Sequence, residues 1–330
     1  MKSFLFPLIA AAMAAVTTAS NDLLYSTRMI ESVMSRKQGV VSSGAVTSTL
    51  DTYGKDGDSA RVANFTKYAD SIVTSTSPTF KSPEAAAKMP LDRLTIGQAL
   101  LHIKATEGTL TSAESETLSL LNSSLTLQTR NKYNGFWYYV YPNWSYLDGT
   151  IELLYLNTYD KSTALTAVWA NKVTGASPYV WGRSLGWYLA GLVNAWEKLG
   201  DCSGGSNAAC VRLTSAIQKQ ASQLCKSIAT YADKETGVWW QLPTLGGKQG
   251  NFLESSSTML YTFSILKGLR LAFLLDYHNG TLGWNGTVAV CSLNSTATYE
   301  YYVGRPIVHN HALGEGAFIL ASLEMERFTN

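Results

Sequence analysis

The sequence predicts an all-α fold. Apolar residues recur every three to four positions over several long segments, which is the pattern of amphipathic helices. Short aromatic loops separate these segments, and the strict strand–helix alternation of a parallel α/β sheet is missing from the pattern. Helix, aromatic loop and helix, repeated along the chain, indicate paired helices whose functional loops lie at one end.

Each expected element rests on its local pattern. Arg36–Asp58 is rich in Ser, Thr and Gly and shows no clear period, so we expect a loop there. Gly135–Pro142 is an aromatic, β-prone run that ends at a proline. The expected helices, in chain order, are Asn21–Met34, Val62–Val73, Ile96–Glu107, Ser112–Gln128, Ser184–Leu199, Ala209–Ala232, Ser255–Leu275 and His311–Arg327.

The N-terminus has the pattern of a secretory signal peptide, which we place at residues 1–19. Lys2 supplies the positive region, Phe4–Val16 is apolar, and Thr17–Ala19 offers small residues for cleavage. We therefore expect an extracellular glycoprotein with one domain over residues 20–330. Sequons for N-glycosylation, which agree with this route, occur at Asn64, Asn122, Asn143, Asn279, Asn285 and Asn294.

Four cysteines also suit an oxidising compartment. Cys202 and Cys210 flank a Gly/Ser/Asn loop and are placed to form a local disulfide, which would leave Cys225 with Cys291. Three connectivities stay open. Metal binding is a poorer alternative, because no histidine lies near the cysteines and no C-x-x-C occurs. We expect no metal and no cofactor.

Composition restricts the class of partner. A net charge of +2 argues against a nucleic-acid partner, and no later segment approaches the length of a membrane span. Nine Trp and eighteen Tyr in a chain with only 15% charged residues are typical of secreted proteins that stack sugar rings on aromatic faces. The alternative is a large aromatic core. We expect a monomer with an oligosaccharide ligand.

The stretch Ser177–Tyr188 opens a helix and is the best candidate for ligand contact. Arg183 lies between two indoles, Trp181 and Trp187, and two glycines nearby suggest an open face. This arrangement suits a ligand that is both ring-shaped and anionic, because the ring stacks while its carboxylate takes the guanidinium. The alternative is an ordinary helix start in the core, with the arginine extending to solvent.

Two carboxylates are candidates for acid–base chemistry. Asp148 follows bulky aromatic residues, and poor solvation there raises a carboxyl pKa and suits a general acid near neutrality. Asp92 stands immediately before a helix, where a structural role at the helix start is the alternative. Two carboxylates with an aromatic floor are the usual requirement for cleaving or modifying glycosides.

Other motifs have simpler interpretations. Glu254 precedes Ser255–Ser257 and is expected to satisfy donors at the start of the next helix. Tyr299–Pro306 is a further aromatic loop with an arginine, which either lines the same cleft or packs beneath it. The four histidines show no ligand spacing with carboxylates.

Four motifs follow one another along the chain: Tyr141-Pro142-Asn143…Leu147-Asp148-Gly149, Ser177-Pro178…Trp181-Gly182-Arg183…Gly186-Trp187, Gly250-Asn251-Phe252-Leu253-Glu254-Ser255-Ser256 and Tyr299-Glu300-Tyr301-Tyr302. In this order they resemble glycoside hydrolase family 105, the unsaturated rhamnogalacturonyl hydrolases, which are related to the unsaturated glucuronyl hydrolases of family 88. The form Trp-Gly-Arg-x-x-Gly-Trp favours family 105.

The resemblance implies an (α/α)6 toroid and hydration of the C4=C5 double bond of a terminal unsaturated uronate. An acid protonates C4, water adds at C5, and the hemiketal collapses to release the sugar. The motif correspondence makes Asp148 the general acid and Asp92 the second acidic residue. The substrate-binding residues that it implies are Tyr141, Asn157, Trp181, Arg183 and Trp187.

Two departures from the family pattern stand out, and the second of them, a shortened interval, predicts a truncated member. Asn157 stands where the family has a histidine, and asparagine donates a hydrogen bond but carries neither proton nor charge. Only twenty residues separate Asp148 from Trp169, about 30 Å as one helix, so a family hairpin has no room there. A degenerate, non-catalytic carbohydrate binder is therefore the competing hypothesis.

Overall fold

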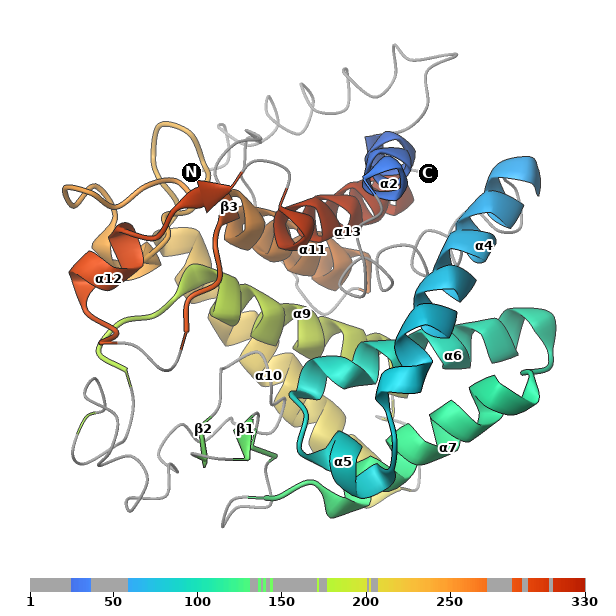
Figure 1. Ribbon diagram of the computed structural model, residues 1–330. Helices are drawn as coiled ribbons and strands as arrows, with labels where there is room; N and C mark the ends of the chain where they lie inside the picture. Colours follow the sequence, from blue (N-terminus) through green and yellow to red (C-terminus); the bar gives the residue numbers. More distant parts are fainter. Residues whose placement is uncertain are drawn as a thin grey trace. The chain divides into compact units, whose positions relative to one another are not determined.

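The computed structural model shows two compact units, which we describe separately (Figure 1). The N-terminal unit comprises residues 25–176 and the C-terminal unit residues 177–330. The residues that the structure describes are 25–36, 59–130, 136–137, 139–140, 143–144, 171, 177–200, 202, 207–271, 287–292, 296–308 and 311–329.

Helices build the N-terminal unit around one apolar cluster. Its core contains Ile96, Leu100 and Leu121, each at most 2% exposed. Helix α7 begins with a capping box in which Thr111 and Glu114 satisfy each other's backbone N–H groups. The elements are α2 (Tyr25–Ser35), α4 (Ser59–Thr76), η2 (Ser77–Thr79), α5 (Pro83–Ala87), η3 (Leu91–Arg93), α6 (Leu94–Glu107), α7 (Ser112–Leu127), and the antiparallel pair β1 (Tyr139–Val140) and β2 (Asn143–Trp144).

The C-terminal unit is organised around α11, which packs against both α9 and α13, while α10 packs against α9 (Figure 1). A short antiparallel pair, β3 and β4, joins the unit near its end. The elements are α9 (Gly182–Leu199), α10 (Ala208–Thr230), η5 (Pro243–Leu245), α11 (Ser255–Arg270), β3 (Thr287–Val288), α12 (Tyr299–Val303), β4 (Ile307–Val308) and α13 (Ala312–Thr329).

The long helices agree with the predicted ones, and their ends differ by only a few residues wherever the structure describes both. The expected aromatic loop at Tyr299 is wrong in part, because α12 forms there once the Thr298 side chain caps the Tyr301 N–H. Helix α5 was not predicted, although Ser82 caps it in the same way. The signal peptide and most of the loop expected at Arg36–Asp58 lie outside the described residues.

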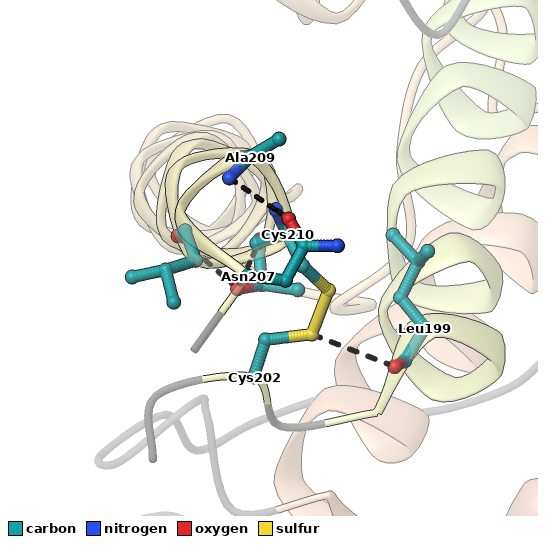
Figure 2. Close-up of a disulfide and its surroundings, with 7 residues drawn as sticks. Leu199, Cys202, Asn207, Ala209 and Cys210 are labelled. Carbon is teal, nitrogen blue, oxygen red and sulfur yellow. Dashed lines mark hydrogen bonds between the residues drawn. A yellow bond between two sulfur atoms is a disulfide. The ribbon is translucent and has the colours of Figure 1, made fainter. Parts of the chain in front are cut away.

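One disulfide closes the turn between α9 and α10 (Figure 2). Cys202 is bonded to Cys210, as the spacing predicted, and Asn207 caps α10 by accepting hydrogen bonds from the backbone N–H groups of Ala209 and Cys210. The suggested second pair is wrong, because Cys225 and Cys291 are buried thiols that form no disulfide. None of the helices that the structure describes is both long enough and apolar enough to cross a bilayer.

Candidate functional site

The candidate segment enters α9 through a tightly held corner. Trp181 is extended (φ −85°, ψ 121°) and Gly182 is the first helical residue. The Gly182 N–H donates to the Gln241 carbonyl at 3.0 Å, and the Tyr261 hydroxyl donates to the Gly182 carbonyl at 2.9 Å. Trp181 is the N-cap residue, but its side chain makes no capping hydrogen bond. The contacts of Gly182 with distant residues therefore fix where α9 begins.

The two glycines of α9 serve helix packing, and the open face expected from them is wrong. A Cβ at Gly186 would lie 2.8 Å from the Leu260 Cβ, and a Cβ at Gly182 would lie 3.1 Å from the Ser257 Cβ. Both neighbours belong to α11. Glycine therefore lets the two helices approach closely, and α11 occupies the face that the spacing left free.

Arg183 is buried instead of extending to solvent. Its side chain is 1% exposed, and one terminal nitrogen donates to the Val288 carbonyl at 2.6 Å. Longer hydrogen bonds join the guanidinium to Ala289 O (3.2 Å) and Ser256 Oγ (3.5 Å). The guanidinium carbon lies 4.7 Å from the centre of the Trp181 ring. Arg183 therefore ties α9 to β3, and its contact with a uronate stays a prediction.

Glu254 performs the structural role that the sequence predicted. Its carboxylate, 1% exposed, accepts the backbone N–H groups of Ser256 (3.2 Å) and Ser257 (2.8 Å) at the start of α11. It also accepts the N–H of Val288 at 3.1 Å, which the sequence did not reveal. Buried carboxylates persist when several donors satisfy them, and this one also joins β3 to α11.

His311 lies beside this group of charges, at the start of α13. Its Nδ1 accepts the Leu313 N–H at 3.3 Å, so the neutral ring carries its hydrogen on Nε2. Burial and the charge of Arg183 lower the pKa of His311, and Glu254 opposes them in part. The ring is therefore neutral near pH 7. The sequence did not indicate His311 as a site residue, because the charged residues near it, Arg183 and Glu254, are far away in the chain.

The aromatic residues of α12 pack against the loop that leads into α9. The Tyr179 ring makes edge contacts with Tyr299 (6.3 Å) and Tyr302 (6.1 Å). Both α12 tyrosines are less than a tenth exposed, and the Lys248 ammonium lies 3.6 Å from the centre of the Tyr299 ring. Packing, one of the two alternatives for this motif, therefore accounts for these two tyrosines.

The structure brings together only part of the predicted site. Trp181, Arg183 and Trp187 share the first two turns of α9 or its entry, and Trp187 is half-buried. Asp92 is exposed on η3 in the N-terminal unit. The other predicted site residues, which lie outside the described residues, are Tyr141, Asp148 and Asn157.

The expected hairpin gap and the expected absence of metal both stay predictions. The interval between Asp148 and Trp169 lies outside the described residues, so the truncation stays a prediction. Within the described ranges, no group of three or more His, Cys, Asp or Glu residues is placed to hold a metal ion.

Comparison with known families decides the chain's ancestry. Residues 154–329, more than half of the chain, match the model of Glycosyl Hydrolase Family 88. The chain belongs to this family. Protein Atu3128 of Agrobacterium fabrum is 26% identical to this glycoside hydrolase over 202 residues, which cover 52% of this chain and 81% of that protein.

Solved structures support the fold of this family 88 member. A family 105 glycoside hydrolase of C. acetobutylicum has a TM-score of 0.74 at 23% identity, covering 92% of this chain and all of that one. A possible family 105 member from Salmonella enterica has a TM-score of 0.60 at 15% identity, over 88% and 83% of the two chains. These similarities confirm the predicted all-α toroid fold class, which this chain shares with structures from family 105.

Proposed function

We propose that this glycoside hydrolase is secreted and removes the terminal unsaturated uronate from rhamnogalacturonan oligosaccharides that a lyase has generated. The observation that carries the proposal is the segment Trp181–Trp187, a Trp-Gly-Arg-x-x-Gly-Trp motif, at the start of α9. Secretion is supported by the N-terminal apolar segment of the sequence and by the Cys202–Cys210 disulfide.

The proposed reaction is hydration of an enol ether, followed by collapse. Asp148, protonated, gives its proton to C4 of the C4=C5 bond. Water adds its oxygen to C5 and returns a proton to the Asp148 carboxylate. The resulting hemiketal breaks its C5–O5 bond to give a ketone at C5 and a hemiacetal at C1, and this hemiacetal expels the next sugar as an alcohol and leaves an aldehyde at C1. Asp92 is the second acidic residue. Trp181, Trp187, Tyr141 and Asn157 contact the sugar, and Arg183 stands close to its acidic group.

Ultraviolet absorbance tests the proposal directly. Incubation of the protein with an unsaturated rhamnogalacturonan disaccharide should remove the absorbance of the enol-acid double bond. Asp148→Asn should abolish this loss, because the amide has no proton to give at neutral pH. An inactive but folded wild-type protein would refute the proposed activity, whereas an active Asp148→Asn variant would mean that the general acid is elsewhere.

One observation favours a second candidate function, a non-catalytic carbohydrate binder. Asn157 occupies the position where the family has a histidine, and the amide cannot replace an imidazole in proton transfer. Calorimetry distinguishes the two functions, because a binder would bind the disaccharide with no decrease in absorbance. Release of reducing sugar from saturated oligosaccharides would instead indicate an ordinary glycosidase.

A further inference from the structure

Trp181 is held on one edge and one face by two buried side chains. Its indole N–H donates to the Gln241 side-chain oxygen at 3.1 Å, and the Arg183 guanidinium lies over its ring at 4.7 Å. An indole nitrogen can only donate, so the amide atom opposite it must be the oxygen. The orientation of the Gln241 amide is therefore fixed by chemistry.

Gln241 makes hydrogen bonds through its backbone N–H, its backbone carbonyl and its side-chain amide. It is fully buried, its backbone N–H donates to the Phe252 carbonyl at 2.8 Å, and its carbonyl accepts from Gly182 at 3.0 Å. The side-chain nitrogen contacts the Cys291 sulfur at 3.8 Å. One residue thus fixes both the first turn of α9 and the ring that precedes it, through its main chain and its side chain respectively.

We propose that Gln241 is a positioning residue of the sugar site, which fixes the plane of the Trp181 indole against which the sugar ring stacks. The inference rests on the proposed function, in which Trp181 contacts substrate. Trp181 as a whole residue is only 9% exposed, so a ligand can reach little of it and the orientation of its ring matters. A ring held in advance loses less freedom when a ligand binds, so Gln241 acts on binding more than on chemistry.

A double-mutant cycle tests this role. Gln241→Met keeps the volume but removes the acceptor, and Trp181→Phe keeps a ring but removes the donor. We expect Gln241→Met to raise the KM for the unsaturated disaccharide about fivefold to tenfold, with kcat within about twofold of wild type. In the Trp181→Phe background the same change should raise KM by less than about twofold. Fully additive effects would overturn the proposal.

Tyr261→Phe is the matched control. It removes another buried hydrogen bond from the same corner, which the Tyr261 hydroxyl donates to the Gly182 carbonyl and not to the side chain of Trp181. We expect a comparable loss of thermal stability with KM within about twofold of wild type. A rise in KM equal to that of Gln241→Met would show that general loosening explains both.

A readout without ligand separates this inference from the proposed function. The NMR signal of the Trp181 indole N–H is identified by its absence in Trp181→Phe. Gln241→Met should shift this signal and accelerate its hydrogen exchange about tenfold or more. An unchanged signal overturns the positioning role whatever the activity. Lack of turnover by the wild-type protein overturns the proposed function instead, and the indole signal still decides whether Gln241 holds Trp181.

Discussion

Val288 has an aliphatic side chain, yet its peptide groups are held by two buried charges of opposite sign. The Glu254 carboxylate accepts its N–H at 3.1 Å, and the Arg183 guanidinium donates to its carbonyl at 2.6 Å. A buried charge is costly unless it is paired or well hydrogen-bonded. Each charged group here is stabilised by main-chain dipoles, so their joint function is to fasten β3 to α9 and α11.

Replacing Glu254 with Gln should destabilise the protein. The amide nitrogen cannot accept, so at least one of the N–H groups at Ser256, Ser257 or Val288 loses its partner while buried. An unsatisfied buried donor costs about 1–3 kcal/mol, and we expect a loss near 2 kcal/mol in urea unfolding. Glu300→Gln is the control, because Glu300 is an exposed acidic residue in the first turn of α12 and should change stability by less than about 0.5 kcal/mol. Equal stabilities of the two variants would contradict this role for Glu254.

The same residues show what a sequence reveals at this scale. The helix-start role of Glu254 was predictable, because its donors follow within three residues. The burial of Arg183 was not, because its carbonyl partners stand 105 and 106 residues further along the chain. Gln241 was missed for a similar reason, since Trp181 lies 60 residues before it. Local donors leave a pattern in the sequence, whereas partners at such separations leave none in a single chain.

At the scale of elements, the contact between α9 and α11 depends on a missing side chain. Gly186→Ala should destabilise the C-terminal unit, because the added Cβ would lie 2.8 Å from the Leu260 Cβ and 3.0 Å from its Cδ1. Overpacking of this kind costs about 1–3 kcal/mol, more than the gain in helix propensity. Thermal unfolding followed by circular dichroism measures the difference.

Gly316→Ala in α13 is the matched control, because an added Cβ there meets nothing within 4 Å. This variant should gain about 0.5–1 kcal/mol from helix propensity alone. If Gly186→Ala were also stabilising, the close approach of α9 to α11 would be incorrect.

Long and short elements differed in how well they could be predicted. Apolar periodicity over several turns identified α9, α10 and α13, since a buried stripe repeats along each of them. Helix α12 spans five residues, and β3 and β4 two each, which is too short for a period to develop. Their formation depends on a Thr298 cap and on pairing with each other.

Across the whole C-terminal unit, a network of four charges joins α9, α11 and α13. Lys267 and Arg270 of α11 both contact Glu197 of α9, at 2.6 and 2.7 Å, and Arg270 also contacts Glu324 of α13 at 2.7 Å. Lys267 is 5% exposed and Glu324 is fully buried. Removing one partner from such a network leaves a buried charge uncompensated, so the three helices are linked electrostatically as well as by packing.

This network predicts acid sensitivity. Burial opposes ionisation of Glu197, but hydrogen bonds from Arg270 and Lys267 outweigh it and lower its pKa from 4.5 to about 2. Because the folded pKa lies below the unfolded value, ionised Glu197 stabilises the fold above pH 4.5, and this stabilisation is lost as the pH falls toward 2. Because the Glu197 side chain is 30% exposed, solvent screens these ion pairs, and we expect a contribution on the order of 1 kcal/mol, measurable by urea unfolding from pH 6 to pH 3.

Glu197→Gln provides the comparison. The variant should be less stable at neutral pH, and its stability should fall less steeply between pH 4.5 and pH 3, because Gln does not titrate. Identical pH slopes for the variant and the wild-type protein would show that Glu197 does not carry this dependence.

At the scale of the chain, four spaced motifs predicted a relative of families 105 and 88, and residues 154–329 match the model of family 88. The motifs do not predict where the two proposed catalytic carboxylates lie relative to each other. Asp92 is exposed on η3, and its partner Asp148 lies outside the described residues. Motif spacing therefore predicts ancestry well, whereas the arrangement of an active site depends on how distant segments meet.

The reduced thiols of Cys225 and Cys291 give the C-terminal unit two internal reporters of opening. Both are buried, and burial raises the pKa of each to about 12, so neither is a thiolate in the folded protein at neutral pH. A thiol-reactive dye therefore labels them only when their surroundings open. One reports on α10 and the other on the segment after β3, so the order in which they are labelled records which part of the unit opens first.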